Sequence, residues 1–148
     1  MEYIDKNGKW WNQSELGEFK MEKNEIINEL DKINEYLKKC MWMDFEFAQM
    51  NASNVTIGGR KDVSYDEWAI NIDFGNPFYL TTLFYWQLDN SNPFIKLVEG
   101  DEMWDIINKY QVEEGNYIFK INAEDFETAP IIIASKSIKC EIVNEKPF

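Results

Sequence analysis

Residues 21–47, MEKNEIINELDKINEYLKKCMWMDFEF, decide the fold class, because the spacing of their apolar side chains changes within this one stretch. Between Met21 and Cys40 the apolar residues recur at intervals of three and four positions, which predicts an amphipathic helix. From Met41 to Phe47 every second residue is apolar instead, which predicts a β-strand with one buried face. A helix followed by strands favours an α+β fold.

The rest of the chain is expected to form further strands and one more helix. Asn7-Gly8 predicts a hairpin turn near the amino end, and residues 68–74 alternate as a half-buried strand does. The run 78–88 is apolar or aromatic on both faces, which predicts a central strand covered on two sides. A shorter helix is expected from about Asp101 to Tyr110. Later strands are expected at 117–121, 131–133 and 138–142.

These elements predict one antiparallel meander of about six to eight strands, with both helices packed on it. The length of 148 residues suits a single domain spanning residues 1–148. A hydrophobic content of 45%, with 16% aromatic residues, argues against disorder despite the formal charge of -12. No apolar run approaches the length of a membrane span, and the first residues lack a signal-peptide pattern. We therefore expect a cytoplasmic protein without membrane contact.

The residue types that are missing exclude several kinds of chemistry. The chain has no histidine, which excludes Ser-His-Asp and Cys-His catalysis and histidine zinc sites. Its two cysteines, Cys40 and Cys140, are too few for a thiolate zinc site, and we expect both to be buried as small apolar residues. No metal or other cofactor is expected. The excess of 27 acidic over 15 basic residues also argues against direct binding of nucleic acid.

Most of the excess negative charge lies in the middle of the chain and toward its carboxyl end, with a net charge of -5 for residues 41–95. Residues 96–127 contain nine acidic and three basic residues, a net charge of -6. A surface with this charge either keeps the protein soluble or steers a cationic partner toward it. The 6 Trp, 7 Tyr and 10 Phe are too many to be central in one small domain, so some are expected at the surface or in a cleft.

Two patterns leave other functions open. Asp44 and Glu46 are two positions apart on one predicted strand face, where a carboxylate pair can act as general acid and base in a hydrolase. The acids between residues 101 and 127 suggest a metal-dependent hydrolase, although they follow no recognised ligand spacing. A sheet lined with aromatic residues is also compatible with a small-ligand-binding module.

A small acidic α+β chain with scattered Trp and Tyr, no catalytic constellation and no export signal resembles the immunity proteins of bacterial polymorphic toxin and contact-dependent inhibition systems. That resemblance implies a non-enzymatic, cytosolic protein that binds one cognate toxin domain, commonly a basic one, and occludes its active site. The negative charge is also compatible with an alternative, a phage anti-defence protein that mimics nucleic acid and blocks a host nuclease.

The expected contact residues combine acids that would occupy cationic groups of the toxin with two tryptophans that would anchor the interface. They are Asp66, Glu67, Trp68, Asp101, Glu102, Trp104, Asp105, Glu113 and Glu114.

Overall fold

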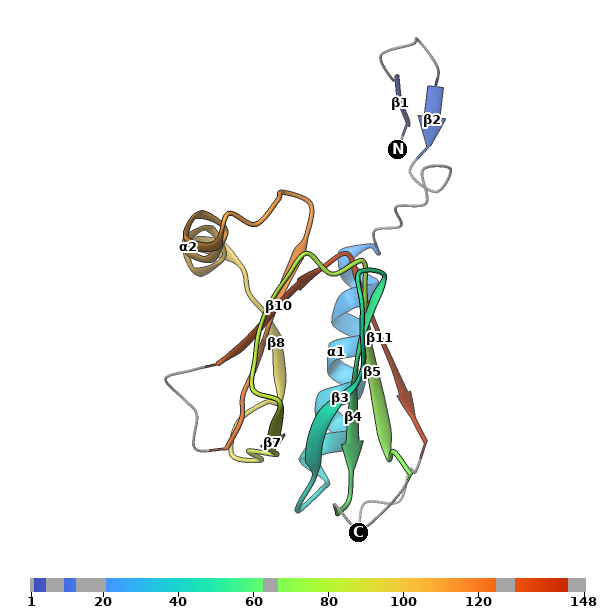
Figure 1. The fold of residues 1–148 in the computed structure, drawn as a ribbon, viewed down its shortest axis with the longest axis vertical. Coiled ribbons are helices and arrows are strands. Elements are labelled where there is room, and N and C mark those ends of the chain that lie inside the picture. Colours follow the sequence, from blue (N-terminus) through green and yellow to red (C-terminus); the bar gives the residue numbers. More distant parts are fainter. Residues whose placement is uncertain (1, 5–9, 13–20, 63–66, 125–129, 144–148) are drawn as a thin grey trace.

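The computed structural model describes residues 2–4, 10–12, 21–62, 67–124 and 130–143, and it confirms an α+β fold built on antiparallel strands (Figure 1). In chain order the elements are β1 (Glu2–Ile4), β2 (Trp10–Asn12), α1 (Lys23–Lys38), β3 (Asp44–Met50), β4 (Asn54–Arg60), β5 (Ile70–Gly75), β6 (Tyr79–Thr81), β7 (Tyr85–Gln87), β8 (Ile95–Leu97), α2 (Gly100–Tyr110), β9 (Tyr117–Ile121), β10 (Ile131–Ser135) and β11 (Ser137–Ile142). Strands β1 and β2 pair as the hairpin prediction requires, but the Asn7-Gly8 turn is outside the described residues.

The strands of the body form two sheets, whereas the sequence predicted a single meander. One sheet has the strand order β11-β5-β4-β3-β7, and the other has the order β6-β10-β9-β8. The expected central strand at 78–88 is wrong, because β6 is an edge of the second sheet and β7 is an edge of the first. The apolar alternation is correct for both short strands, but it does not show that the chain leaves one sheet and enters the other.

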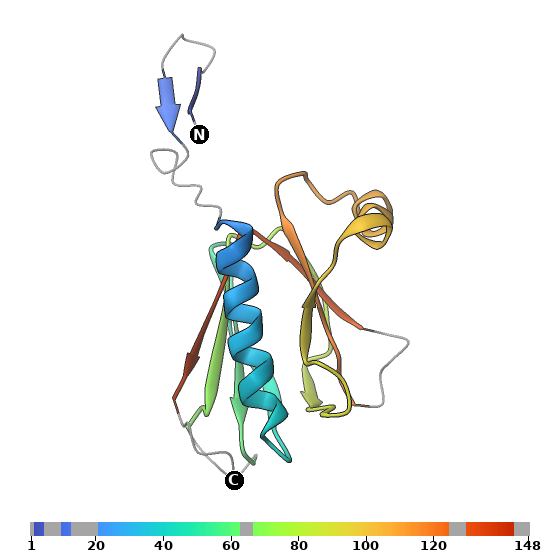
Figure 2. The same cartoon turned by 180° about the vertical axis from the view of Figure 1, so that it is seen from behind.

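Both predicted helices are present, and the longer one contacts strands of both sheets. The buried residues of α1 recur at helical spacing and include Ile26, Leu30 and Ile33. Figure 2 shows α1 lying in front of the five-stranded sheet and running nearly along its strands, with the four-stranded sheet at its side. Asn34 bonds to both backbone groups of Ile95 at the edge strand β8, with its side-chain amide donating at 2.9 Å and its oxygen accepting at 3.1 Å.

Aromatic pairs join the two sheets inside the core. Phe45 of β3 contacts Phe94, the residue before β8, with ring centroids 4.5 Å apart. Phe74 of β5 contacts Phe119 of β9 at 5.4 Å, edge to face. All four rings are buried. Because each pair has one member on each sheet, the sheets share one hydrophobic core with α1.

The outer face of the four-stranded sheet carries α2 over a second, smaller cluster of apolar side chains. Strand β10 is buried along its whole length, with Ile131 and Ile133 in the main core and Ile132 in the smaller cluster. Only Ile106 of α2 is buried, so most of this helix faces outward. None of the described helices combines the length and the apolar composition that a membrane span requires.

The two cysteines are buried and unpaired, as the sequence predicted. Burial raises the pKa of the Cys140 thiol to about 11 and also raises the pKa of Cys40. At about pH 8 the folded protein therefore carries on the order of one thiolate per thousand Cys140 side chains. We expect a thiol-disulfide reagent to label neither cysteine of the native protein rapidly, and to label both at once in concentrated guanidinium chloride. Rapid labelling without denaturant would contradict this burial.

Candidate functional site

The structure divides the predicted contact residues between two places. Asp101, Glu102, Trp104 and Asp105 lie on α2, and Glu113 and Glu114 follow it in the turn before β9. Glu67 and Trp68 precede β5, and Asp66 is outside the described residues. Figure 1 shows α2 and the start of β5 toward opposite ends of the long axis. The two groups therefore do not form one surface.

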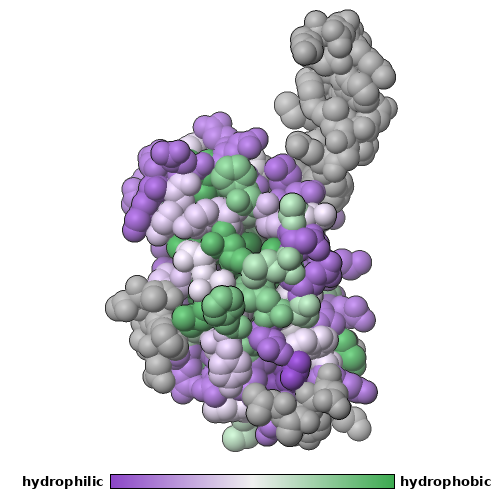
Figure 3. All heavy atoms as spheres, in the orientation of Figure 1, coloured by the Kyte–Doolittle hydropathy of each residue, from purple (hydrophilic) through white to green (hydrophobic). Residues whose placement is uncertain are grey.

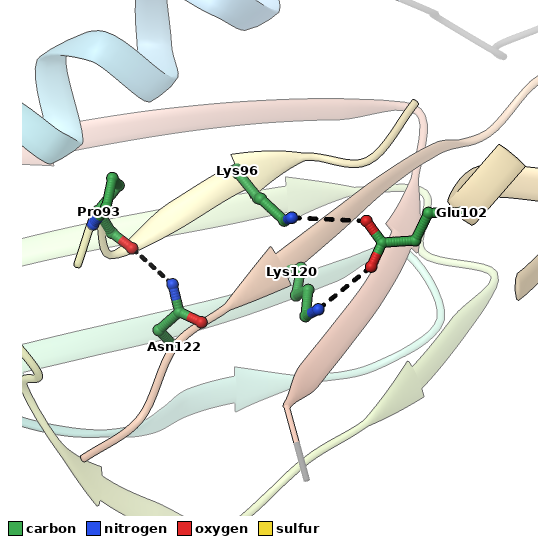
Figure 4. Close-up of polar contacts among 5 residues, drawn as sticks. All are labelled: Pro93, Lys96, Glu102, Lys120 and Asn122. Atoms are coloured by element: carbon green, nitrogen blue, oxygen red, sulfur yellow. Dashed lines mark hydrogen bonds and ion pairs between the residues drawn. The ribbon is translucent and has the colours of Figure 1, made fainter. Parts of the chain in front are cut away.

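Glu102 is a structural contact of α2 and not a free charge. Its carboxylate accepts from Lys96 of β8 at 3.4 Å and from Lys120 of β9 at 3.2 Å (Figure 4). The hydrogen bond from Lys120, with the charge of Lys96 beside it, lowers the pKa of the Glu102 carboxyl. These two partly exposed ion pairs link the first turn of α2 to β8 and β9 of the sheet.

Four other acids of this region, Asp101, Asp105, Glu113 and Glu114, are exposed. Among the residues that the structure describes, no lysine or arginine forms an ion pair with Asp101, Asp105, Glu113 or Glu114. Asp101 and Asp105 are four positions apart on one side of the helix, where like charges destabilise it slightly. A cation supplied from outside would remove this repulsion.

Trp104 stands among these acids with its side chain half exposed. It is 48% exposed and lines a pocket of about 310 Å³ together with Glu99 and Glu114. Lys23 of α1 is paired with Glu99 at the edge of this pocket. A large aromatic side chain beside uncompensated carboxylates is the composition expected of an interface anchor with a charged rim.

A second pocket, of about 430 Å³, lies on the β6 side of α2. Asp105, Lys109 and Tyr110 form its helical wall, and the segment 81–83 forms the opposite wall. The next residue along the chain is Phe84, which is 89% exposed. Figure 3 shows apolar side chains gathered in the middle of this face, with hydrophilic residues around them. An exposed apolar patch with a polar rim marks an interaction site more often than chance exposure does.

The sequence did not identify Phe84 as a candidate contact residue. Phe84 is two positions before Trp86, which is 2% exposed. Alternation along a strand therefore predicts that both side chains face the core. Phe84 is exposed because the chain leaves β6 and turns into β7 at this point. No local motif marks that turn. Trp104 and Glu114 line one of the two pockets beside α2, and Asp105 lines the other. We use the name acidic-aromatic face for the exposed residues Phe84, Asp101, Trp104, Asp105, Glu113 and Glu114.

Trp68 has a packing role that needs no partner. A Cβ atom built on Gly58 would lie 2.5 Å from the Trp68 ring, so the indole fills the space that a side chain of β4 would occupy. The Arg60 guanidinium lies 4.2 Å from the centroid of the same ring. Glu67, in contrast, is exposed.

The two carboxylates of the hydrolase hypothesis line one pocket of about 180 Å³ on the outer face of β3. Glu46 is paired with Arg60 at 2.7 Å, and Asp44 accepts hydrogen bonds from Trp42 and Tyr85. Among the described residues no group of three or more carboxylates and thiolates is placed to hold a metal ion.

The geometry thus offers one candidate for protein contact, the acidic-aromatic face, and one small polar pocket on the other sheet. Comparison of the chain with protein-family models, with curated proteins and with solved structures finds no match.

Proposed function

We propose that this protein is a non-catalytic cytoplasmic inhibitor that binds one basic protein domain through the acidic-aromatic face, as an immunity protein binds its toxin. The observation that carries the proposal is the 89% exposure of Phe84, which directly follows a segment that lines one pocket with Asp105 of α2. Asp105 is one of four exposed carboxylates in this region that have no ion-pair partner among the described residues. An exposed apolar patch with a polar rim is typical of an interaction site, and an acidic rim selects a cationic partner.

The two kinds of side chain would contribute differently to binding. Phe84 and Trp104 would bury apolar surface in the complex and slow dissociation. Asp101, Asp105 and Glu114 would attract the partner and speed association, and this effect would weaken as salt screens the charges. Such a division fits an inhibitor that covers the cationic active site of a nuclease.

The proposal is tested with the tagged full chain and lysate of the source cell, washed at low and then at high salt. We expect one basic protein at a ratio near one to one, whose association slows as salt rises. The purified partner must also lose its enzymatic or toxic activity when the chain is added. A partner that stays fully active in the complex would contradict inhibition, and the absence of any partner would contradict the proposal as a whole.

Two matched double variants distinguish a specific role of the acidic-aromatic face from an effect of the protein's net negative charge. Asp101→Lys with Asp105→Lys should slow association by about tenfold or more at low salt. Asp31→Lys with Glu35→Lys makes the same charge change on the exposed side of α1 and should have a much smaller effect. Equal effects of the two double variants would mean that only net charge matters. Competition by DNA or RNA for the partner would point instead to nucleic-acid mimicry.

A further inference from the structure

The two large sheets, in the part of the chain that the structure describes, have four edge strands. These are β11 and β7 in one sheet, and β8 and β6 in the other. An edge strand has backbone N–H and C=O groups without a neighbouring strand, and an extended segment of another chain can pair with them. Whether an edge is open to such a segment depends on what already bonds to those groups.

The chain covers three of the four edges with its own groups. At β8 the Asn34 side chain of α1 bonds to both backbone groups of the first strand residue. At β11 the Lys32 amino group donates to the Cys140 carbonyl at 3.1 Å. At β7 the Gln87 carbonyl accepts from the Glu124 backbone N–H at 3.1 Å. An added strand would have to displace these contacts.

At β6 the open backbone groups belong to Leu80. The Ala134 carbonyl of β10 accepts from the Phe78 N–H at 2.7 Å, so the backbone groups of Ala134 point toward β6. Neighbouring residues of a strand direct these groups to opposite sides, so those of Ile133 point toward β9. Leu80 is opposite Ile133 in the register and therefore directs its own N–H and C=O away from β10. No group in the described part of the chain bonds to either one.

The side chains around this edge determine what an added strand would face. Leu80 packs against the main core, whereas Tyr79 packs against the smaller cluster under α2. Phe78, just before β6, is 46% exposed, and Phe84, shortly after it, is 89% exposed. A strand added here would cover apolar surface with its inward side chains. Its outward side chains would lie near the pocket beside α2, whose charged residues favour polar groups.

The charge of the chain distinguishes between possible occupants of the β6 edge. A second copy of this chain would bring another net charge of -12 to the contact and would be repelled. A basic chain would be attracted instead. The edge also leads directly to Phe84, the exposed ring of the acidic-aromatic face, so one partner could contact both.

We infer that an extended segment of the basic partner adds to β6 as a fifth strand of the four-stranded sheet. Apolar residues of that segment face inward, and polar or cationic residues alternate with them. The inference rests on the proposed function for the identity of the partner. Because β6 has only three residues, the paired segment is short, and the exposed rings beside it supply the remaining contact.

The test uses the full chain and a hexapeptide in which valine alternates with lysine. Residues that are opposite each other in a sheet share one face, so a valine should pair with Leu80 and the lysines should point outward. At about 1 mM peptide we expect the Leu80 amide proton to exchange with solvent about tenfold more slowly than in the free chain. Hydrogen exchange followed by NMR measures this difference.

N-methyl groups on the peptide provide a matched control for strand pairing. On the valines they remove the N–H groups that should donate to the Leu80 carbonyl, and binding should weaken by about tenfold or more. On the lysines they lie at the far edge of the added strand and should change binding much less. Replacement of the lysines by glutamates should also weaken binding, because the chain is negatively charged.

A proline variant and its control locate the site on the protein. Leu80→Pro removes the outward N–H but no bond to β10, which an edge strand tolerates, and should weaken peptide binding by about tenfold. Ile142→Pro makes the same change on the β11 edge, since Val143 donates to Ala69 and the Ile142 N–H therefore points away from β5. It should leave peptide binding unchanged. If Leu80→Pro does not fold, the methylated peptides still decide the test.

Three results would overturn the inference. The first is a Leu80 amide that is protected in the free chain, and protection that rises with protein concentration would show a second copy at the edge. The second is that the valine-lysine peptide leaves Leu80 exchange unchanged. The third is equal binding of the two methylated peptides, or of the lysine and glutamate peptides. None of these measurements uses the partner, so their failure leaves the inhibitor proposal standing, whereas lysate that yields no partner contradicts that proposal.

Discussion

Replacement of Phe45 by alanine is expected to lower the free energy of unfolding by about 3–5 kcal/mol. The ring is fully buried and contacts Phe94 at 4.5 Å and Trp86 at 5.8 Å. The backbone also approaches it closely, since a Cβ atom on Gly59 would lie 2.8 Å from the ring. Alanine would leave a cavity between the two sheets where their aromatic side chains meet. The surrounding strands could fill this cavity only by changing their register.

Denaturant unfolding followed by tryptophan fluorescence and by circular dichroism measures this loss. Phe84→Ala is the matched control, because the same residue type is removed from a site that is 89% exposed, and its effect should stay within about 0.5 kcal/mol. Similar losses in the two variants would mean that the sheets do not meet through Phe45. A circular dichroism transition that precedes the fluorescence transition would mean that the sheets unfold separately.

The same Phe84→Ala variant is expected to weaken binding of the basic partner by about 30-fold or more, mainly through faster dissociation. An interface anchor that is truncated to alanine commonly costs about 2 kcal/mol or more, and the Phe84 ring has little other contact to lose. Trp104→Ala should act in the same direction, since its ring is 48% exposed beside Glu114. Surface plasmon resonance with the purified partner separates the association and dissociation rates.

Val143→Ala serves as the control for these binding variants. Val143 is an exposed apolar residue that follows β11, at the opposite edge of the five-stranded sheet from β7. Its replacement should leave both rates unchanged. If Phe84→Ala binds as tightly as the natural chain and Val143→Ala binds more weakly, the partner contacts the β11 edge of the five-stranded sheet. The inhibitor proposal would then survive, but the acidic-aromatic face would not be its contact surface.

Both helices and most strands could be predicted from the sequence because their patterns are local. The apolar spacing between Met21 and Cys40 corresponds to α1 at Lys23–Lys38, and the expected second helix corresponds to α2 at Gly100–Tyr110. The last predicted strand, at 138–142, corresponds to β11. Each of these patterns reports which face of an element is buried, and that is settled within a few residues of chain.

The arrangement of the sheets and the position of the candidate site could not be predicted in this way. Alternation in 78–88 marks apolar positions but not a change of sheet, which depends on pairing with β10 and β3, strands far away in sequence. Trp68 looks like Trp104 in the sequence, each beside acidic residues, yet only the structure shows that Gly58 lies under one of them. The same limit applies to Arg60, whose contacts with Glu46 and Trp68 depend on strand register.

The order of strands within the two sheets sets when this chain can fold during its synthesis. Strand β10 is an inner strand of one sheet, and β11 covers an edge of the other beside β5. Both follow the other described elements in chain order, so the earlier strands keep open edges until about residue 142 has emerged from the ribosome. The core therefore closes in one late step, and premature termination before β10 leaves two incomplete sheets that are targets for chaperones and proteases.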